Sequence, residues 1–352
     1  MGIYLFIFLG LSIIGLIYPK VREKKLCIFL FFLVVFLISA FRASFIGKDY
    51  ETYVSVHRSK LYLYGWGYNM LSCLANFLGE SYIWLGILVN IVIFGNLWMT
   101  YSKKIDKKYL LFSLGLWVLN PYCFIQSSMN ILRQGCAMSC VLFATCFLNK
   151  GWKKNLYYLL FILLGGAFHK SAYAFILLLP FGMLNWKRSF HLILLLVCVI
   201  INLLFNGRQL IQPFAKLLGY SGYLNYAPSS FDVPVFTLFV VFVVVYLLYR
   251  YPILYQNKEE KWYVDIYLVS LSLLLVLVKN DIAYRMYIYF SFISPISISY
   301  IIKNTSRYLR GNIEKRLVKI GYIGYYTALY WMFLLMQMLN HNIHYFPFRF
   351  WK

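Results

Sequence analysis

Long apolar runs separated by short basic clusters dominate this chain. Of its 352 residues, 62% are hydrophobic and 13% are charged, so too few polar side chains are present to cover the surface of a water-soluble globule. We therefore predict an all-α fold, a polytopic transmembrane helical bundle of about twelve membrane helices, because a span requires about 20 apolar residues. Ten to twelve of them would be full spans, roughly one per long apolar run. Residues 1–352 would form a single integral membrane domain without a soluble domain.

Each predicted helix follows one apolar run. The runs are Ile3 to Tyr18, Leu26 to Phe41, Tyr82 to Tyr101, Tyr109 to Ile125, Ile131 to Leu148, Leu156 to Phe168, Ser171 to Leu184, Phe190 to Phe205, Pro234 to Arg250, Trp262 to Val278, Met286 to Ile302, and Lys319 to Leu339. The run Trp66 to Leu78 is also apolar. Counting it as a span would place the basic residues of segment 103–108 outside the cytoplasm, against the positive-inside bias. We therefore expect an interfacial or re-entrant helix there.

The basic residues also indicate the topology. The opening run lacks the basic n-region of a cleavable signal peptide, and basic residues follow it from Lys20 onward, which predicts a retained first helix with its N-terminus outside. Leu156 to Leu184 could form one long helix or two short ones. A hairpin that turns at His169 and Lys170 keeps most of the later Lys and Arg residues inside. Both chain ends are then expected outside.

Charge and cysteine usage argue against two other kinds of site. The net charge of +23 could indicate nucleic-acid binding, but the 34 Lys and Arg residues lie in short scattered clusters, so we expect no nucleic-acid partner. The basic loop Lys303 to Arg316 is predicted to contact anionic lipid headgroups. Cys136, Cys140 and Cys146 share one predicted helix without an accompanying His or carboxylate. We expect them to pack in the interior, and we expect no metal and no cofactor.

Residues capable of chemistry gather in segments predicted to lie outside. The longest such segments are 42–81 and 206–233, and loops of this length are uncommon without a purpose. The candidate site residues come from the first segment and from three helix ends on the same predicted face. They are Arg42, Asp49, Tyr53, Arg133, Gln134, His169, Lys170, Tyr284 and Arg285.

Arg133 carries the strongest of these signals. It lies at the start of an otherwise apolar helix, where an arginine costs about 2.5 kcal/mol or more if it reaches the bilayer centre. An anionic ligand, phosphate above all, suits its guanidinium group because the two can form bidentate hydrogen bonds. The alternatives are a structural bridge to Asp49 or Asp281, or a side chain that extends to the surface. Arg285 follows the same logic, with Asp281 four residues earlier as an alternative partner.

His169 and Asp49 are the candidate bases. A neutral imidazole at a partly immersed hairpin tip can accept a proton from a hydroxyl nucleophile, although His169 could also be an ordinary polar tip residue. Asp49 and Tyr53 are four residues apart and share a face if their segment is helical. Asp49 could orient a sugar hydroxyl, act as the base or hold Arg42, and the sequence leaves these roles open.

Four short motifs occur in a fixed order between the apolar runs. They are Phe41-Arg42 with Gly47-Lys48-Asp49 and Tyr53; Asn130-Ile131-Leu132-Arg133-Gln134 followed by Ala137; Phe168-His169-Lys170-Ser171-Ala172; and Tyr284-Arg285 with Tyr287. Their order and spacing resemble the EpsG-like branch of the Wzy-type polysaccharide polymerases from about Phe41 to Tyr289. The stretch 206–233 matches no part of this pattern.

The resemblance implies glycosyl transfer on the outer face of the bacterial cytoplasmic (inner) membrane. The growing chain on undecaprenyl pyrophosphate would move onto the terminal hydroxyl of a new lipid-linked repeat unit, giving O-antigen, capsule or exopolysaccharide. The implied partners are undecaprenyl-pyrophosphate-linked oligosaccharides and membrane lipids, while a chain-length regulator and a flippase stay open as further partners. A single displacement without a metal would invert the anomeric carbon.

The resemblance also suggests roles for the candidate residues. Arg133 and Arg285, with Arg42 in support, would stabilise the charge that the leaving pyrophosphate accumulates. His169 is the first choice for the base that deprotonates the attacking hydroxyl, and Asp49 is the second. The remaining substrate-site candidates are Tyr53, Gln134, Lys170 and Tyr284.

Two other classes of function stay open as alternatives. A flippase or transporter of lipid-linked oligosaccharide would also need basic residues and many helices, but such proteins often show repeated halves and charges deep in several helices, which this sequence does not display. A membrane acyltransferase that modifies polysaccharide could use a similar base and hydroxyl acceptor, although we find no acyl-donor signature in the sequence.

Overall fold

A computed structural model describes most of the chain. The described residues are 2–17, 24–79, 81–148, 151–184, 186–204, 234–254, 257–278, 281–308, 312–339, 345 and 348–350. The chain divides into two compact units, of which unit 1 comprises Met1–Met183 with Val318–Lys352 and unit 2 comprises Leu184–Leu317. Within the described ranges both units are built from helices, which confirms the all-α prediction. The predicted loop 206–233 lies outside the described residues.

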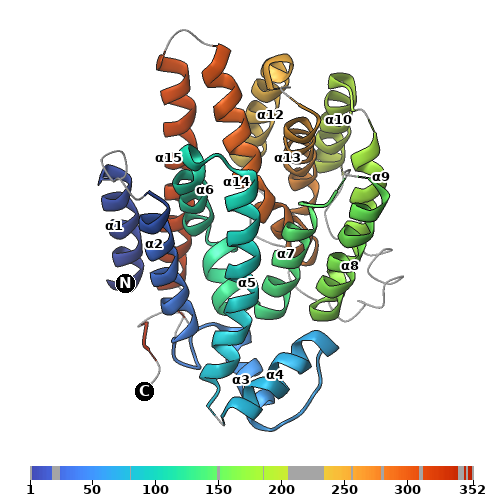
Figure 1. The fold of residues 1–352 in the computed structure, drawn as a ribbon. Coiled ribbons are helices and arrows are strands. Elements are labelled where there is room, and N and C mark those ends of the chain that lie inside the picture. Colours follow the sequence, from blue (N-terminus) through green and yellow to red (C-terminus); the bar gives the residue numbers. More distant parts are fainter. Residues whose placement is uncertain are drawn as a thin grey trace. The chain divides into compact units, whose positions relative to one another are not determined.

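Figure 1 labels the α-helices of the protein, and most of the described helices belong to unit 1. They are α1 (Gly2–Ile17), α2 (Lys24–Ala40), α3 (Lys48–Arg58), α4 (Trp66–Leu78), α5 (Ile83–Lys104), α6 (Lys107–Leu119), the π-helix η2 (Tyr122–Asn130), α7 (Leu132–Ala144), α8 (Trp152–Phe168), the 3-10 helix η3 (Lys170–Leu177) and α9 (Leu178–Met183). The last long helix, α15 (Asn312–Leu339), begins in unit 2 and continues in unit 1. The predicted interruption at His169 is confirmed, because α8 ends just before it and η3 begins just after it.

Helix α7 lies at the centre of unit 1. Nearly all of its residues are buried, and it packs against α5 and α8. Small residues allow these helices to approach closely, as is usual between membrane helices. A Cβ atom on Gly165 of α8, for example, would lie 3.3 Å from the carbonyl oxygen of Ala137. Polar side chains also bridge the helices, since Asn96 of α5 donates a hydrogen bond to Ser139 of α7 over 3.2 Å.

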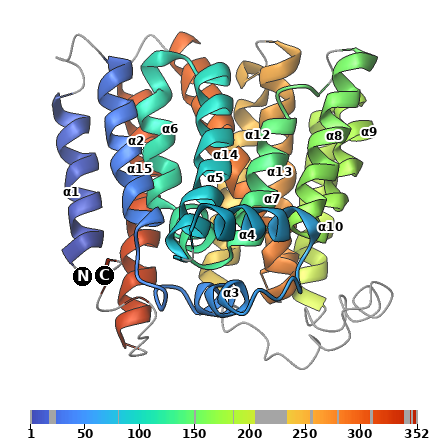
Figure 2. The ribbon, with the colours of Figure 1, turned by 60° about the horizontal axis from the view of Figure 1, so that its bottom comes forward.

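Helices α3 and α4 run across one end of unit 1 instead of along it (Figures 1 and 2). Two glycines allow the chain to pack closely against the ends of η2 and α8. Gly47, just before α3, has φ +96° and presses against the carbonyl group of Met129, so a side chain there would be strained and would clash. Gly65, just before α4, presses in the same way against the carbonyl group of Ala167 at the end of α8.

Unit 2 is formed by α10 (Arg188–Leu204), α12 (Pro234–Leu254), α13 (Lys258–Leu277), α14 (Asp281–Tyr308) and the first residues of α15. Helix α13 packs against α10, α12 and α14. Its N-terminus is capped by Asn257, whose side-chain oxygen accepts a hydrogen bond from the backbone N–H of Glu260 over 2.7 Å.

The described residues contain fewer helices that are long enough to cross a membrane than the sequence predicts. Three described helical segments are long and apolar enough to cross a membrane, namely Ile83–Lys104, Thr237–Leu254 and Tyr284–Thr305. A fourth results if α6 and η2 are counted together. The prediction of ten to twelve full spans is therefore not confirmed among the described residues. Length is the main reason, because a helix such as α7 with 13 residues extends only about 20 Å against a hydrocarbon core of about 30 Å.

The predicted continuous helix Tyr109 to Ile125 is wrong. The chain leaves the helical conformation at Asn120, and α6 and η2 meet there at an angle of 62°. Pro121 explains the break, because its ring disfavours the helical conformation of the preceding residue and it lacks a backbone N–H. The apolar pattern runs through this position without interruption and therefore concealed the break.

Candidate functional site

The site begins at the junction between η2 and α7. After η2 ends at Asn130, Ile131 adopts a non-helical conformation with φ −85° and ψ 56°, and α7 starts at Leu132 without a capping side chain. The first N–H groups of a helix lack partners within the helix and carry the positive end of its dipole. Because Arg133 is the second residue of α7, a guanidinium group and a helix N-terminus lie together, an arrangement that favours anions.

Arg133 is half-buried and has no acidic partner among the described residues. Its guanidinium carbon lies 4.3 Å from the centre of the Tyr64 ring, and its Nε atom is buried without a hydrogen-bond partner. The structural bridge to Asp49 that the sequence left open is not formed. The other alternative partner, Asp281, belongs to unit 2, and its side chain is not among those described. The positive charge of Arg133 is therefore left uncompensated within the described part of unit 1.

An aromatic cluster lies beneath Arg133. The ring centre of Tyr64 lies 5.3 Å from that of Tyr53 and 5.6 Å from that of Tyr68. The ring centres of Tyr53 and Tyr68 are 5.4 Å apart. Tyr68 is fully buried, whereas Tyr64 is partly exposed next to the guanidinium group. Burial raises the pKa of Tyr64, and Asp49 adds to this effect, while Arg133 acts in the opposite direction. Arg133 and Asp49 are thus both close enough to Tyr64 to interact with it electrostatically.

Asp49 lies on α3 beside the η2–α7 junction. Its backbone N–H donates a hydrogen bond to the side-chain oxygen of Asn130 over 2.8 Å, and Asn130 donates in turn to Gln126 over 2.7 Å. Gln126 then donates to the hydroxyl group of Tyr345 over 3.2 Å. The Asp49 carboxylate is half-buried and forms no hydrogen bond or ion pair with a described residue. The backbone hydrogen bond to Asn130 therefore fixes the position of Asp49, and the carboxylate oxygens are left available as hydrogen-bond acceptors.

Arg42, for which a supporting role at the pyrophosphate was predicted, has its side chain in the interior of unit 1. Its side chain is fully buried, lies 3.6 Å from the centre of the Tyr50 ring, and donates hydrogen bonds to the carbonyl groups of Ser39 and Ile46. Carbonyl groups at a helix C-terminus need such donors. Arg42 therefore secures the end of α2 and the following loop, and the expected contact with pyrophosphate is not accessible in this conformation.

Two further candidate residues of unit 1 are also buried in this structure. The side chain of Gln134 is buried in the helical interior, not exposed at the site, because its position on α7 faces the neighbouring helices. Tyr53 is nearly buried within the aromatic cluster. It packs against Tyr64 and exposes little surface to a ligand. Lys170 is exposed at the start of η3.

His169 lies between α8 and η3. Its Nδ1 atom accepts a hydrogen bond from the backbone N–H of Ser171 over 3.4 Å and lies 2.5 Å from the Ser171 hydroxyl oxygen. Because a backbone N–H can only donate, Nδ1 acts as an acceptor, and the neutral ring then carries its proton on Nε2. The lone pair that a general base needs is therefore already engaged with Ser171.

Arg285 and Tyr284 belong to unit 2, in the first part of α14, where Arg285 is exposed and Tyr284 is partly buried. Their contribution to the site in unit 1 stays a prediction. Sequence reasoning passed over Tyr64 and Tyr68. The available signal was the aromatic density of the uncharged stretch Tyr62 to Tyr68, which 33 tyrosines in the chain made hard to notice.

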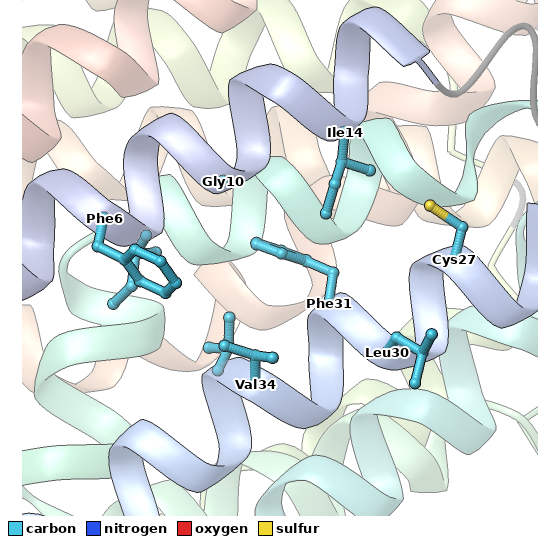
Figure 3. Close-up of a pocket in the computed structure, with 9 residues that line it drawn as sticks. Phe6, Gly10, Ile14, Cys27, Leu30, Phe31 and Val34 are labelled. Atoms are coloured by element: carbon cyan, nitrogen blue, oxygen red, sulfur yellow. The ribbon is translucent and has the colours of Figure 1, made fainter.

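An apolar cavity in unit 1 offers no group for this chemistry. It lies between α1 and α2, has a volume of about 290 Å³, and is lined by residues such as Phe6, Ile14, Leu30 and Val34 (Figure 3). The side chain of Cys27 is the most polar group in its wall. Such a lining suits hydrocarbon, not a charged or sugar-like ligand.

The fold and this site define an all-helical membrane protein with a cationic, tyrosine-lined site at one end of a helical unit. The chain belongs to the EpsG family, which matches residues 25–350. This membership indicates a membrane protein of polysaccharide biosynthesis. No curated protein and no solved structure matches the chain significantly.

Proposed function

We propose that this protein is a polymerase that joins undecaprenyl-pyrophosphate-linked oligosaccharide repeat units into O-antigen, capsular polysaccharide or exopolysaccharide on the outer face of the cytoplasmic membrane. One observation carries the proposal beyond family membership. Arg133 holds a positive charge at the N-terminus of α7, above Tyr64, without an acidic partner among the described residues. A diphosphate is the ligand that such a site favours.

The proposed reaction is a single displacement at the anomeric carbon of the donor sugar. The acceptor hydroxyl oxygen forms a bond to that carbon, while the bond to the pyrophosphate oxygen breaks and the leaving group takes the electron pair. Arg133 and the α7 N-terminus stabilise the charge that develops on the pyrophosphate. The configuration at the anomeric carbon is inverted.

The proton of the acceptor hydroxyl requires a base, and the geometry favours Asp49 over His169. Asp49 presents a carboxylate that no described residue occupies, and it lies close enough to Tyr64 to interact with it electrostatically, as Arg133 does. His169 has its acceptor nitrogen engaged with Ser171, so we assign it a role as a hydrogen-bond donor through Nε2–H. Lys170 and Arg285 are proposed as additional cationic contacts to the lipid diphosphates.

The three classes of function leave different products when the gene is deleted. Loss of a polymerase leaves single repeat units on the surface glycolipid, loss of a flippase leaves the units trapped inside, and loss of an acyltransferase leaves chain length unchanged. A gel of surface polysaccharide separates these outcomes. Unchanged chain length in the deletion strain would overturn the proposal.

The purified protein offers a direct test. Incubated with the lipid-linked repeat unit in bilayer discs, it should release undecaprenyl pyrophosphate and form polymer. NMR should then show opposite anomeric configurations at the new linkage and at the linkage of the lipid-linked donor. Retention of configuration would contradict the single displacement, although it would leave polymerisation itself intact.

A further inference from the structure

The surface of α4 divides into two contrasting faces. Trp66, Met70 and Phe77 are 60%, 63% and 86% exposed, and they recur at the spacing that aligns residues along one side of a helix. The opposite face, which includes Tyr68 and Ala75, is buried where α4 packs against α5 and α8. Exposure of such an apolar stripe to water is unfavourable, so we expect lipid or another apolar surface to contact it.

Helix α4 and the residues just before it lack charged side chains. From Leu61 to Leu78 the chain contains no Asp, Glu, Lys or Arg. The neighbouring helix α3 is different, since its exposed residues include Lys48, Glu51, Ser55 and Arg58. Figure 2 shows that these two helices lie across the same end of unit 1. The exposed side chains of α3 are polar, whereas those of α4 are mainly apolar.

The connection to α5 decides what covers the apolar face. Helix α5, with 22 residues, is one of the segments that can cross a membrane, and its N-terminal end must then lie near the boundary of the hydrocarbon core. Only segment 79–82 separates α4 from α5, and four residues reach at most about 14 Å. The C-terminal end of α4 is therefore held close to the membrane boundary.

From these observations we infer that the exposed face of α4 lies in the lipid bilayer, parallel to the membrane surface. Its occupant is the boundary between lipid headgroups and acyl chains, where uncharged amphipathic helices bind through their apolar face. Trp66 and Tyr62, at the beginning of the stripe, are residue types enriched at this depth. The polar face of α3 remains in water.

This placement has a consequence for the site, which rests on the proposed function. Tyr64 lies two residues before the start of α4, and its ring contacts Arg133, so immersion of α4 sets both residues at the level of the headgroups. A diphosphate attached to a membrane-embedded isoprenoid lies at the same level. The helix thus fixes the depth at which unit 1 meets the reacting end of a lipid-linked substrate.

Spin labels can test the placement of α4 without reference to activity. In a variant with Cys27 and Cys73 replaced by alanine, single cysteines at Leu74 and Phe77 on α4 would be labelled and compared with cysteines at Glu51 and Ser55 on α3. The full chain would be reconstituted in vesicles of phosphatidylcholine and phosphatidylglycerol. We expect the α4 labels to collide more with lipid-soluble oxygen than with a water-soluble nickel chelate, and the α3 labels to show the reverse order.

Two results would overturn the inference. The α4 labels could favour the nickel chelate as the α3 labels do, which would place the stripe in water. They could also be protected from both reagents and show spin–spin broadening, which would identify a second copy of the chain as the cover.

Activity then tests the consequence for the site. Phe77→Asp should abolish most polymer formation by lifting α4 out of the lipid, whereas the matched variant Ser55→Asp should keep it. Lipid contact of α4 combined with full activity of Phe77→Asp would overturn the role in setting depth. Failure of the unmodified protein to form polymer would instead overturn the proposed function and leave the spin-label result standing.

Discussion

The carboxylates of Asp265 and Glu260 in unit 2 differ from the guanidinium group of Arg133 in unit 1 in whether they have an oppositely charged partner. In unit 2, Asp265 lies 3.0 Å from His191 and 3.7 Å from Lys261, and Glu260 lies 3.0 Å from Lys303. In unit 1, Arg133 has no acidic partner within the described ranges. A buried charge that is paired is costly to disrupt, whereas a charge without a partner is suited to a ligand. The paired groups of unit 2 therefore fit structural roles, whereas the unpaired Arg133 fits the binding role that we propose for it.

The largest expected effect is on the stability of unit 2. Asp265 also accepts a hydrogen bond from the hydroxyl group of Tyr251 over 2.7 Å. Asp265→Asn should therefore destabilise the protein by about 3 to 5 kcal/mol, because Lys261 loses its counter-charge and the buried hydrogen bonds of His191 and Tyr251 to the carboxylate are lost or weakened. The measurement is the midpoint of thermal or denaturant unfolding in detergent.

A double variant sharpens this result. Adding His191→Gln to Asp265→Asn should cost less than the sum of the two single changes, because both remove the same interaction. Additive losses would show that the two residues do not stabilise each other, and the contrast between the units would then be lost.

Arg133 should show the opposite behaviour, with a large effect on activity and a small one on stability. Arg133→Ala should lower the rate of polymerisation by about 100-fold to 1000-fold, as expected when one group that stabilises transition-state charge is removed. Arg133→Lys should recover only part of the rate, since lysine keeps the charge but loses the bidentate geometry. Arg58→Lys on the exposed face of α3 is the matched control, and the rates would be measured with purified lipid-linked repeat units.

Asp49 and His169 can be separated by conservative substitutions. Asp49→Asn removes the proposed base and should slow polymerisation by about 100-fold or more, whereas Glu51→Gln, two residues further along α3, should have little effect. His169→Gln should retain more activity than Asp49→Asn, because an amide can still donate a hydrogen bond. If His169→Gln proved the more damaging change, His169 would be restored as the base.

The smallest expected effect concerns a buried histidine in unit 1 that we regard as structural. His57 of α3 lies 2.8 Å from the Ser72 hydroxyl group of α4. Burial lowers the pKa of His57, and Arg58 acts in the same direction. The unfolded chain therefore binds this proton more readily than the folded protein, so stability should hold above the ordinary value near 6.5 and fall as the pH drops below it.

The pH dependence gives this prediction a simple test. Between about pH 7.5 and about pH 5.5 the protein should lose stability through His57, and His57→Gln should remove that part of the loss. An unchanged pH profile in His57→Gln would show that the packing of α3 on α4 does not depend on this group.

Much of the architecture could be predicted from the order of apolar and polar residues. The positions of most helices follow from it, and the predicted bounds of the helix Trp66 to Leu78 agree with α4. The interruption at His169 could be predicted as well, because the distribution of basic residues along the chain favours a hairpin. The break at Pro121 was missed, because the apolar pattern continues through it.

The sequence by itself determined that the protein is helical and membrane-bound, that it shares the motifs of the EpsG family, and that Arg133 is unusual. Only the tertiary structure decided that Arg42 and Gln134 face inward and that Tyr64 lies beneath Arg133. The physical reason is that hydrophobic periodicity reports how each residue relates to its own helix axis. Which side chains meet depends on how different helices pack, and that packing joins residues far apart in the chain.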